Sequence, residues 1–203
     1  QVRGLLAEFG ITFNQGVATL RKAIPCLLED AENGLHALFR DALSLKYEPL
    51  CQLDEWVKNL SDTIQKEANE HHEMKLLQSI PGYGPILSST FYSVIGDGKG
   101  FRKGRDASAS IGVVPRQHST GGKNVLLGIS KKGDKYLRSL MVHGARSLIK
   151  HAHKKEDALS VWVTALIERR GKNKATVALA NKLTRIGWAV VRTGKPYKEN
   201  YAV

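Results

Sequence analysis

Apolar side chains recur at steps of three and four residues along most of the chain, a spacing that predicts amphipathic helices. In the first half, one helix is predicted over residues 17–45, broken or kinked near Pro25, and a second begins after Pro49 and runs to about Ser79. The second helix carries a heptad-like apolar seam made of Leu50, Leu53, Val57, Leu60 and Ile64. This seam fits an antiparallel helical hairpin within one chain and a coiled coil between subunits equally well.

In the second half, glycine and proline interrupt the helical pattern at residues 80–85 before an apolar run resumes, which predicts a tight turn between two helices. A flexible basic loop over residues 96–104 and a short helix over residues 106–111 follow. Residues 112–130 contain paired valines and a Val-Leu-Leu run around two glycines, so they predict a small β-hairpin or an extended loop.

Two further helices complete the pattern. Gly133 and Asp134 introduce the first, and the second covers residues 174–192 with Asn173 as its cap. The expected fold is therefore mainly α: a helical hairpin or coiled coil over residues 1–79, serving as linker and oligomerisation region, is followed over residues 80–203 by a helical domain with a helix-hairpin-helix and a small β-hairpin or loop insertion.

The charge is distributed unevenly between these regions. The formal net charge is +12, but the first 80 residues hold 8 Lys and Arg against 12 Asp and Glu, whereas the remaining 123 hold 23 against 7. A strongly basic half joined to a mildly acidic one favours an assembly or spacer region attached to a polyanion-binding one.

Several classes of protein are disfavoured. The two cysteines, Cys26 and Cys51, form no CxxC motif, so neither a disulfide framework nor a cysteine zinc site is expected. No apolar run approaches the ~20 residues of a membrane span, and no signal peptide opens the chain. Walker, GxSxG and dinucleotide motifs are absent from the sequence, and no metal site is expected in this segment.

The turn Ile80-Pro-Gly-Tyr-Gly-Pro85 resembles a helix-hairpin-helix, with Gly82, Tyr83 and Gly84 as candidate nucleic-acid contacts. Glycines there let backbone approach a phosphate, and the N–H groups that open the next helix can donate to it. The alternative is a plain turn with a glycine C-cap and a proline at the first helical position.

A second candidate is the loop from Pro115 to Lys123, where Ser119 and Thr120 lie beside two glycines and between Arg116 and Lys123. An exposed hydroxyl flanked by cations suits attack on a phosphodiester, although a glycine-rich turn with backbone-bonded hydroxyls has the same pattern.

A third candidate is the basic stretch of Lys131, Lys132 and Arg138, which leads into a helix N-terminus and favours phosphate binding or, alternatively, a soluble helix start.

Taken in order, residues 1–11, 80–85, 111–123 and 129–138 resemble the DEDD/serine transposases of insertion-sequence family one-hundred-ten, and within it the eleven-eleven subgroup. The resemblance spans essentially the whole chain. It implies that Ser119 is the nucleophile that links to DNA during strand cleavage and rejoining, with Thr120 as the fallback if the alignment shifts by one residue.

The resemblance also implies partners and a cofactor. In the family, a RuvC-like domain binds Mg²⁺ through four acidic residues, and this segment is expected to lack that domain and not to complete recombination by itself. DNA, a bridge RNA and further copies of the chain are the expected partners, in the bacterial cytoplasm and at the nucleoid when DNA is bound. The competing hypotheses are a non-catalytic helix-hairpin-helix module that binds nucleic acid and a purely structural oligomerisation domain.

Overall fold

The computed structural model describes residues 2–120, 122 and 125–199, and the chain separates into two compact units, Gln1–Leu60 and Ser61–Val203. Within the described residues, the only strands are β1 (Pro115–Gln117) and β2 (Leu126–Ile129), and helices account for most of the rest. The prediction of a mainly α fold is confirmed.

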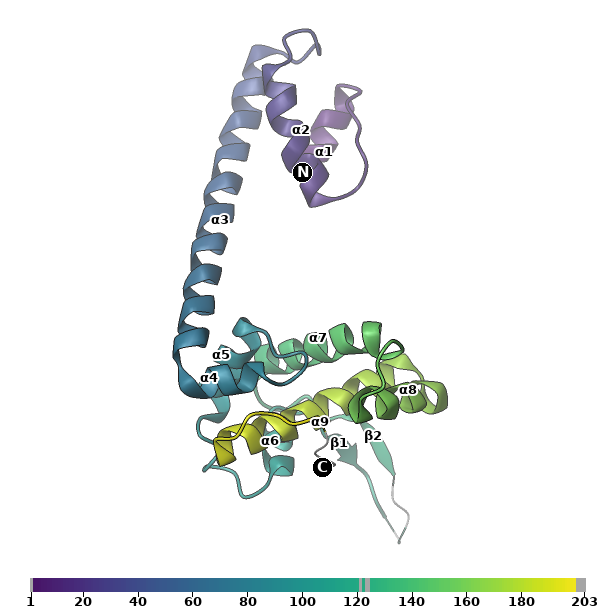
Figure 1. Cartoon of the computed structure of the whole chain (residues 1–203). Helices are drawn as coiled ribbons and strands as arrows, with labels where there is room; N and C mark the ends of the chain where they lie inside the picture. The colour runs from purple at the N-terminus through teal and green to yellow at the C-terminus, as the bar shows by residue number, and fades with distance from the viewer. Residues whose placement is uncertain (1, 121, 123–124, 200–203) are drawn as a thin grey trace. The chain divides into compact units, whose positions relative to one another are not determined.

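The first unit contains α1 (Val2–Glu8), α2 (Val17–Glu29) and the beginning of α3 (Ala37–Glu70), which lie together in Figure 1. Arg21 of α2 forms an ion pair with Asp54 of α3 at 2.6 Å, while Arg40, near the start of α3, donates to the carbonyl of Leu28 at the end of α2. These contacts make α2 and α3 an antiparallel pair. The core of the first unit consists of Leu6, Ile24, Leu35 and Leu43.

Two predicted helix boundaries are wrong. The helix predicted over residues 17–45 is two helices, because the chain turns at residues 30–36 and the Arg40 guanidinium caps the C-terminus of α2, donating to the carbonyls of Leu27 and Leu28 at 3.0 Å each. Pro49 does not begin a helix but lies inside α3. The carbonyl of Leu45, which Pro49 cannot bond, belongs to an exposed residue, so water can reach it.

Three residues of the apolar seam of α3, Leu53, Val57 and Leu60, are exposed, whereas Leu50 and Ile64 are half-buried. The coiled coil between subunits stays a prediction.

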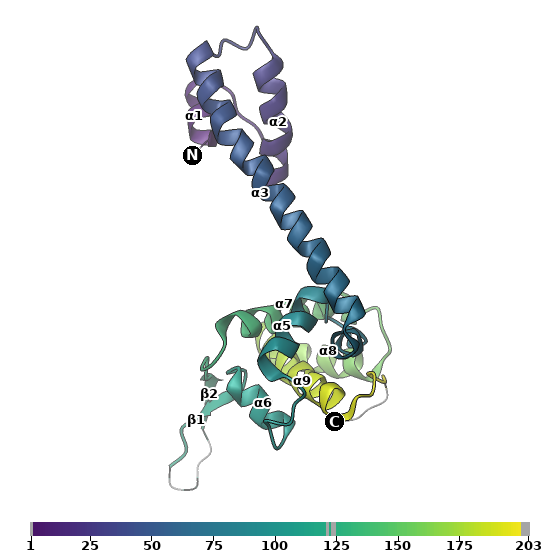
Figure 2. The ribbon, with the colours of Figure 1, turned by 90° about the vertical axis from the view of Figure 1, so that its left-hand side faces the viewer.

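The second unit is built around α9 (Lys172–Thr193). Around it lie α4 (His72–Gln78), α5 (Pro85–Ile95), α6 (Gly104–Ser110), α7 (Lys135–Ala152) and α8 (Ala158–Arg170), which Figure 1 labels and Figure 2 shows from another side. Its core includes Phe91, Ile111, Leu137, Met141, Leu179 and Leu183. Leu77 and Ile80, on either side of the expected domain boundary at 79/80, belong to this same core.

Helix starts in this unit agree with the sequence in some places and not in others. The Asp134 carboxylate accepts from the Leu137 N–H at 2.6 Å, which confirms it as the cap of α7. Asn173 is not the cap of α9, because Gly171 occupies that position and Asn173 lies inside the helix. The sequence analysis missed α8, which lies between α7 and α9 in the chain.

The predicted tight turn between α4 and α5 is present and packs against α7 and α9. Gly82 has φ 85°, and a Cβ atom on Gly144 of α7 would lie 2.7 Å from the Gly82 carbonyl oxygen. Tyr83 is buried, and its hydroxyl donates to the Leu183 carbonyl of α9 at 3.1 Å. Burial raises the pKa of this hydroxyl well above its ordinary value, so Tyr83 stays a neutral donor. The turn is therefore fixed by close backbone approach.

Replacing Gly144 with Ala should lower the free energy of unfolding by about 1–3 kcal/mol, because the added methyl group meets backbone rather than a flexible side chain. Thermal or urea unfolding measures the change. The matched control is Gly100→Ala, where an added Cβ has open space around it and stability should hold. Equal stability of the two variants would contradict the close approach of α7 to the turn.

Candidate nucleic-acid interface

The expected β-hairpin is present between α6 and α7. Strands β1 and β2 are antiparallel, with Pro115 opposite Ile129 and Gln117 opposite Leu126, and a register irregularity lies between these two pairs. The His118 N–H donates to the Val125 carbonyl at 2.9 Å and extends the pairing beyond the strands. Figures 1 and 2 both show the strands projecting from the helices of the second unit.

The root of this hairpin is held by backbone contacts. Gly112 and Gly133 both have positive φ, and a Cβ atom on Gly133 would overlap the carbonyl oxygen of Ser110. The Lys131 N–H donates to the Gly112 carbonyl at 3.1 Å, and Asn181 of α9 donates to the Val113 carbonyl at 3.2 Å. The hairpin therefore leaves the helical body at a fixed position.

Arg138 has a structural role at this root. Its Nη1 atom donates to the carbonyls of Ile111 at 2.9 Å and Lys132 at 3.2 Å, joining the two ends of the hairpin segment. Lys131 and Lys132 are exposed beside it, and Lys131 has the left-handed φ of 56°. Two exposed lysines therefore lie on a turn that the hydrogen bonds of Arg138 stabilise.

Ser119 follows β1 and is exposed, as are Thr120 and Arg116. The Gln117 amide Nε2 donates to the Ser119 Oγ at 3.0 Å, which orients the hydroxyl oxygen. Lys123, the other expected phosphate-binding cation of this loop, lies outside the described residues. The arrangement offers an oriented, solvent-facing hydroxyl on a projecting hairpin.

The candidate contacts of the α4–α5 turn belong to a different part of the unit. Tyr83 is buried and packs inside the protein, whereas Gly84 is exposed at the N-terminus of α5. This turn meets α7 at Gly144, six residues after Arg138, which corresponds to roughly 9 Å along the helix. The structure therefore does not gather the candidates at one point but links them through α7.

The exposed side of α7 carries a basic stripe. Helix α7 contains no acidic residue, and it carries exposed cationic or titratable side chains at helical spacing along one side: Lys135, His143, Arg146 and Lys150. We call these four residues the α7 stripe. A solvated face normally mixes both signs of charge, whereas this one carries no acidic residue.

Comparison with known proteins assigns the family. Residues 74–160 match the family model described as Transposase IS116/IS110/IS902 family. A transposase for insertion sequence element IS1111A from Coxiella burnetii is 41% identical over 198 residues, which cover 98% of this chain and 54% of that protein. The chain belongs to this transposase family.

Two other transposases match the same extent of the chain. A probable family 20 transposase of Pseudomonas aeruginosa is 38% identical and a transposase for insertion sequence element IS1328 of Yersinia enterocolitica is 36% identical, each over 98% of this chain and 59% of its own length. The chain thus spans a little over half the length of these curated relatives.

No group of three or more His, Cys, Asp or Glu side chains among the described residues is placed to hold a metal ion. None of the described helices is long and apolar enough to cross a membrane.

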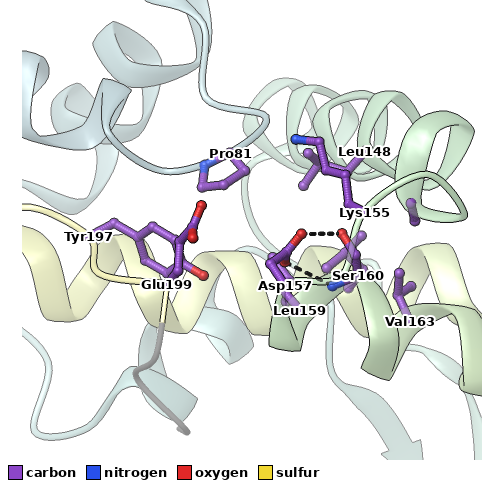
Figure 3. Close-up of a pocket in the computed structure, with 11 residues that line it drawn as sticks. Pro81, Leu148, Lys155, Asp157, Leu159, Ser160, Val163, Tyr197 and Glu199 are labelled. Atoms are coloured by element: carbon purple, nitrogen blue, oxygen red, sulfur yellow. Dashed lines mark hydrogen bonds between the residues drawn. The ribbon is translucent and has the colours of Figure 1, made fainter.

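A small cavity lies between the α4–α5 turn, the start of α8 and the C-terminal segment (Figure 3). Its volume of about 30 Å³ leaves room for little more than a water molecule, so it is too small for a nucleotide. Partial burial alone would raise the pKa of Asp157 at its edge, but hydrogen bonds from the Ser160 hydroxyl and from the N–H groups of Ser160 and Leu159 outweigh it and lower the pKa. Asp157 caps α8 and belongs to the structural frame.

Replacing Asp157 with Ala should cost about 1 kcal/mol of unfolding free energy at pH 7, the usual loss for a helix cap. Because the folded-state pKa is lowered, the stabilisation by the ionised carboxylate is present above the unfolded value near ~3.9 and disappears as the pH falls through the folded value. Urea unfolding at pH 7 and near pH 3 should show the difference from wild type narrowing in acid. Asp157→Asn, which keeps a cap oxygen, serves as control and should lose less.

Proposed function

We propose that this chain is the portion of a transposase that binds DNA and supplies the serine nucleophile for strand cleavage and rejoining. The observation that carries the proposal is the placement of Ser119: its hydroxyl is exposed on a hairpin whose root is fixed by backbone contacts and lined by Lys131 and Lys132. The family resemblance of the residues around Ser119 supports the same assignment.

The reaction proposed for Ser119 is a transesterification. A bond forms between Oγ and the phosphorus of a DNA phosphodiester as the bond from phosphorus to one deoxyribose oxygen breaks. The serine proton leaves to solvent, and the departing sugar oxygen takes up a proton, so charge and atoms balance without oxidation or reduction. The phosphoserine link keeps a phosphoester bond available for rejoining.

The nearby cations would stabilise the reacting phosphate. Arg116 lies three residues before Ser119, and the strand pairing returns the chain to Lys131 and Lys132 at the root. The charge of Arg116 would offset the negative charge that develops on the oxygens of the reacting phosphate, and Lys131 and Lys132, at the opposite end of β1 from Ser119, would bind neighbouring phosphates. Arg138 would act indirectly, by holding the carbonyls of Ile111 and Lys132.

The proposed partners extend beyond a single DNA duplex. The α3 seam would join copies of the chain as a coiled coil, and the α7 stripe would bind phosphate groups of DNA or of a bridge RNA. Magnesium would be bound by carboxylates of a RuvC-like domain rather than by the described residues.

A non-catalytic binding module is the second candidate function. Gly84 is exposed at the N-terminus of α5, and no side chain caps that helix, so its first N–H groups can donate to a phosphate as in a helix-hairpin-helix. Such a module would bind nucleic acid without forming a covalent link.

Covalent trapping separates the two functions. The protein, expressed with any residues that flank this segment in its gene, should form a serine-linked adduct with insertion-sequence end DNA, detected by denaturing gel and peptide mass spectrometry. Ser119→Ala should abolish the adduct, because no oxygen remains to attack phosphorus. Thr120→Ala is the matched control and should retain it. An adduct that survives Ser119→Ala but not Thr120→Ala would move the nucleophile by one residue, and its absence from wild type would favour the binding module.

The α7 stripe makes a separate prediction about salt dependence. In a triple variant with Lys135, Arg146 and Lys150 each changed to Gln, the slope of log binding constant against log salt should become shallower by roughly 0.9 for each phosphate that is no longer neutralised. Fluorescence anisotropy over a salt series measures the slope. The matched control changes the exposed α3 residues Lys46, Lys58 and Lys66 to Gln and should leave the slope near wild type. Equal slopes in all three proteins would exclude α7 from the interface.

A further inference from the structure

The hairpin that carries Ser119 has an unusual apolar surface. Val125, Leu126 and Leu127 are consecutive, and their side chains are 47%, 66% and 46% exposed. Both strands of the hairpin face solvent except at Ile129, and a two-stranded ribbon without further packing is only marginally stable in water. A partner that covers the ribbon would stabilise it.

The arrangement of the apolar side chains on the ribbon limits the shape of a partner that could cover them. Successive side chains of a strand point to opposite faces, so Leu126 lies on one face of the ribbon and Val125 and Leu127 lie on the other. A flat protein surface would cover only one of these faces. A groove with two walls would cover both.

The charges around the ribbon indicate that the partner that provides this groove is a polyanion. No Asp or Glu occurs in the sequence between Asp106 and Asp134, whereas Arg116 within β1 and Lys131 and Lys132 shortly after β2 are exposed. Phosphate groups line both edges of a DNA groove, so cations on and beside an apolar ribbon are complementary to it.

The size of the ribbon selects between the grooves. Two strands lie ~4.8 Å apart, and their outward side chains widen the ribbon further. The minor groove of B-form DNA is ~6 Å wide, whereas the major groove is ~12 Å wide and admits a two-stranded ribbon. Apolar side chains in the major groove meet thymine methyl groups and base edges.

We propose that strands β1 and β2 lie in the major groove of duplex DNA, with Leu126 and Leu127 packed against base edges on opposite faces of the ribbon. The inference rests on the proposed function, since it places the duplex beside Ser119. It adds a contact mode to that function: apolar insertion positions the phosphodiester, and the surrounding cations hold the backbone.

Dimethyl sulfate probing tests the insertion, because this reagent methylates guanine N7 in the major groove. The probe is a duplex that spans the junction between the insertion sequence and its flanking DNA. Wild-type chain should protect guanines over a few consecutive base pairs. The double variant Leu126→Ser with Leu127→Ser should lose this protection and bind about tenfold more weakly, equivalent to about 1.4 kcal/mol.

The controls separate insertion from general binding. Both leucines are exposed, so the double variant should keep the wild-type melting temperature. Val161→Ser makes the same kind of change at an exposed apolar residue of α8 and should retain both affinity and protection. An RNA duplex of the same sequence should bind the double variant and wild type equally, because its major groove is too narrow for side chains to read.

The outcomes distinguish this inference from the proposed function. If the wild-type chain does not bind the duplex, both the insertion of the ribbon and the proposed function are overturned. Binding without guanine N7 protection, or protection that survives in the double variant, would overturn insertion while leaving a Ser119 adduct free to support the proposed function. A double variant that changes sedimentation but not DNA protection would identify the ribbon as a protein interface and also overturn the inference.

Discussion

The close approach of two backbone segments at the hairpin root is the constraint on which the functional surface depends. Gly112 and Gly133 both adopt positive φ, and a side chain on Gly133 would collide with the carbonyl of Ser110. The segment after α6 and the segment before α7 can lie against each other only because these two residues lack Cβ atoms. Arg138 then donates to carbonyls from both segments. The hairpin therefore has a fixed origin although most of its own residues are exposed.

Helix α7 connects this root to the rest of the second unit. Its N-terminus follows the basic turn at Lys131 and Lys132, its buried side packs in the core, and Gly144 receives the α4–α5 turn. Its exposed side carries the α7 stripe. One helix thus fixes the distance between two candidate phosphate-binding regions, and a change in its packing would displace both. Because the α7 stripe lies along one rigid helix, its positive charges keep fixed positions relative to one another.

The sequence predicted the periodic elements well and the context-dependent ones poorly. Helix α9 and the Asp134 cap of α7 follow from local spacing and capping chemistry. The break after α2 does not, because Arg40 caps that helix from a position beyond the turn. Helix α8 was not predicted because its apolar residues do not follow one side of the helix. Val161 is exposed, while Val163 is buried. The burial of Tyr83 likewise depends on α9, which lies about one hundred residues away in the sequence.

The assignment of Ser119 draws on both the family resemblance and the geometry of the hairpin. Resemblance selects Ser119, since the same spacing of hydroxyls and glycines suits an ordinary turn. Geometry adds that the hydroxyl is exposed and accepts a hydrogen bond from the Gln117 amide, a group that can orient the oxygen but cannot remove its proton. An exposed serine in water is a weak nucleophile at neutral pH. In the proposed reaction, the groups that activate Ser119 would gather around the phosphodiester when DNA binds the hairpin, which would make assembly on DNA a part of the chemistry.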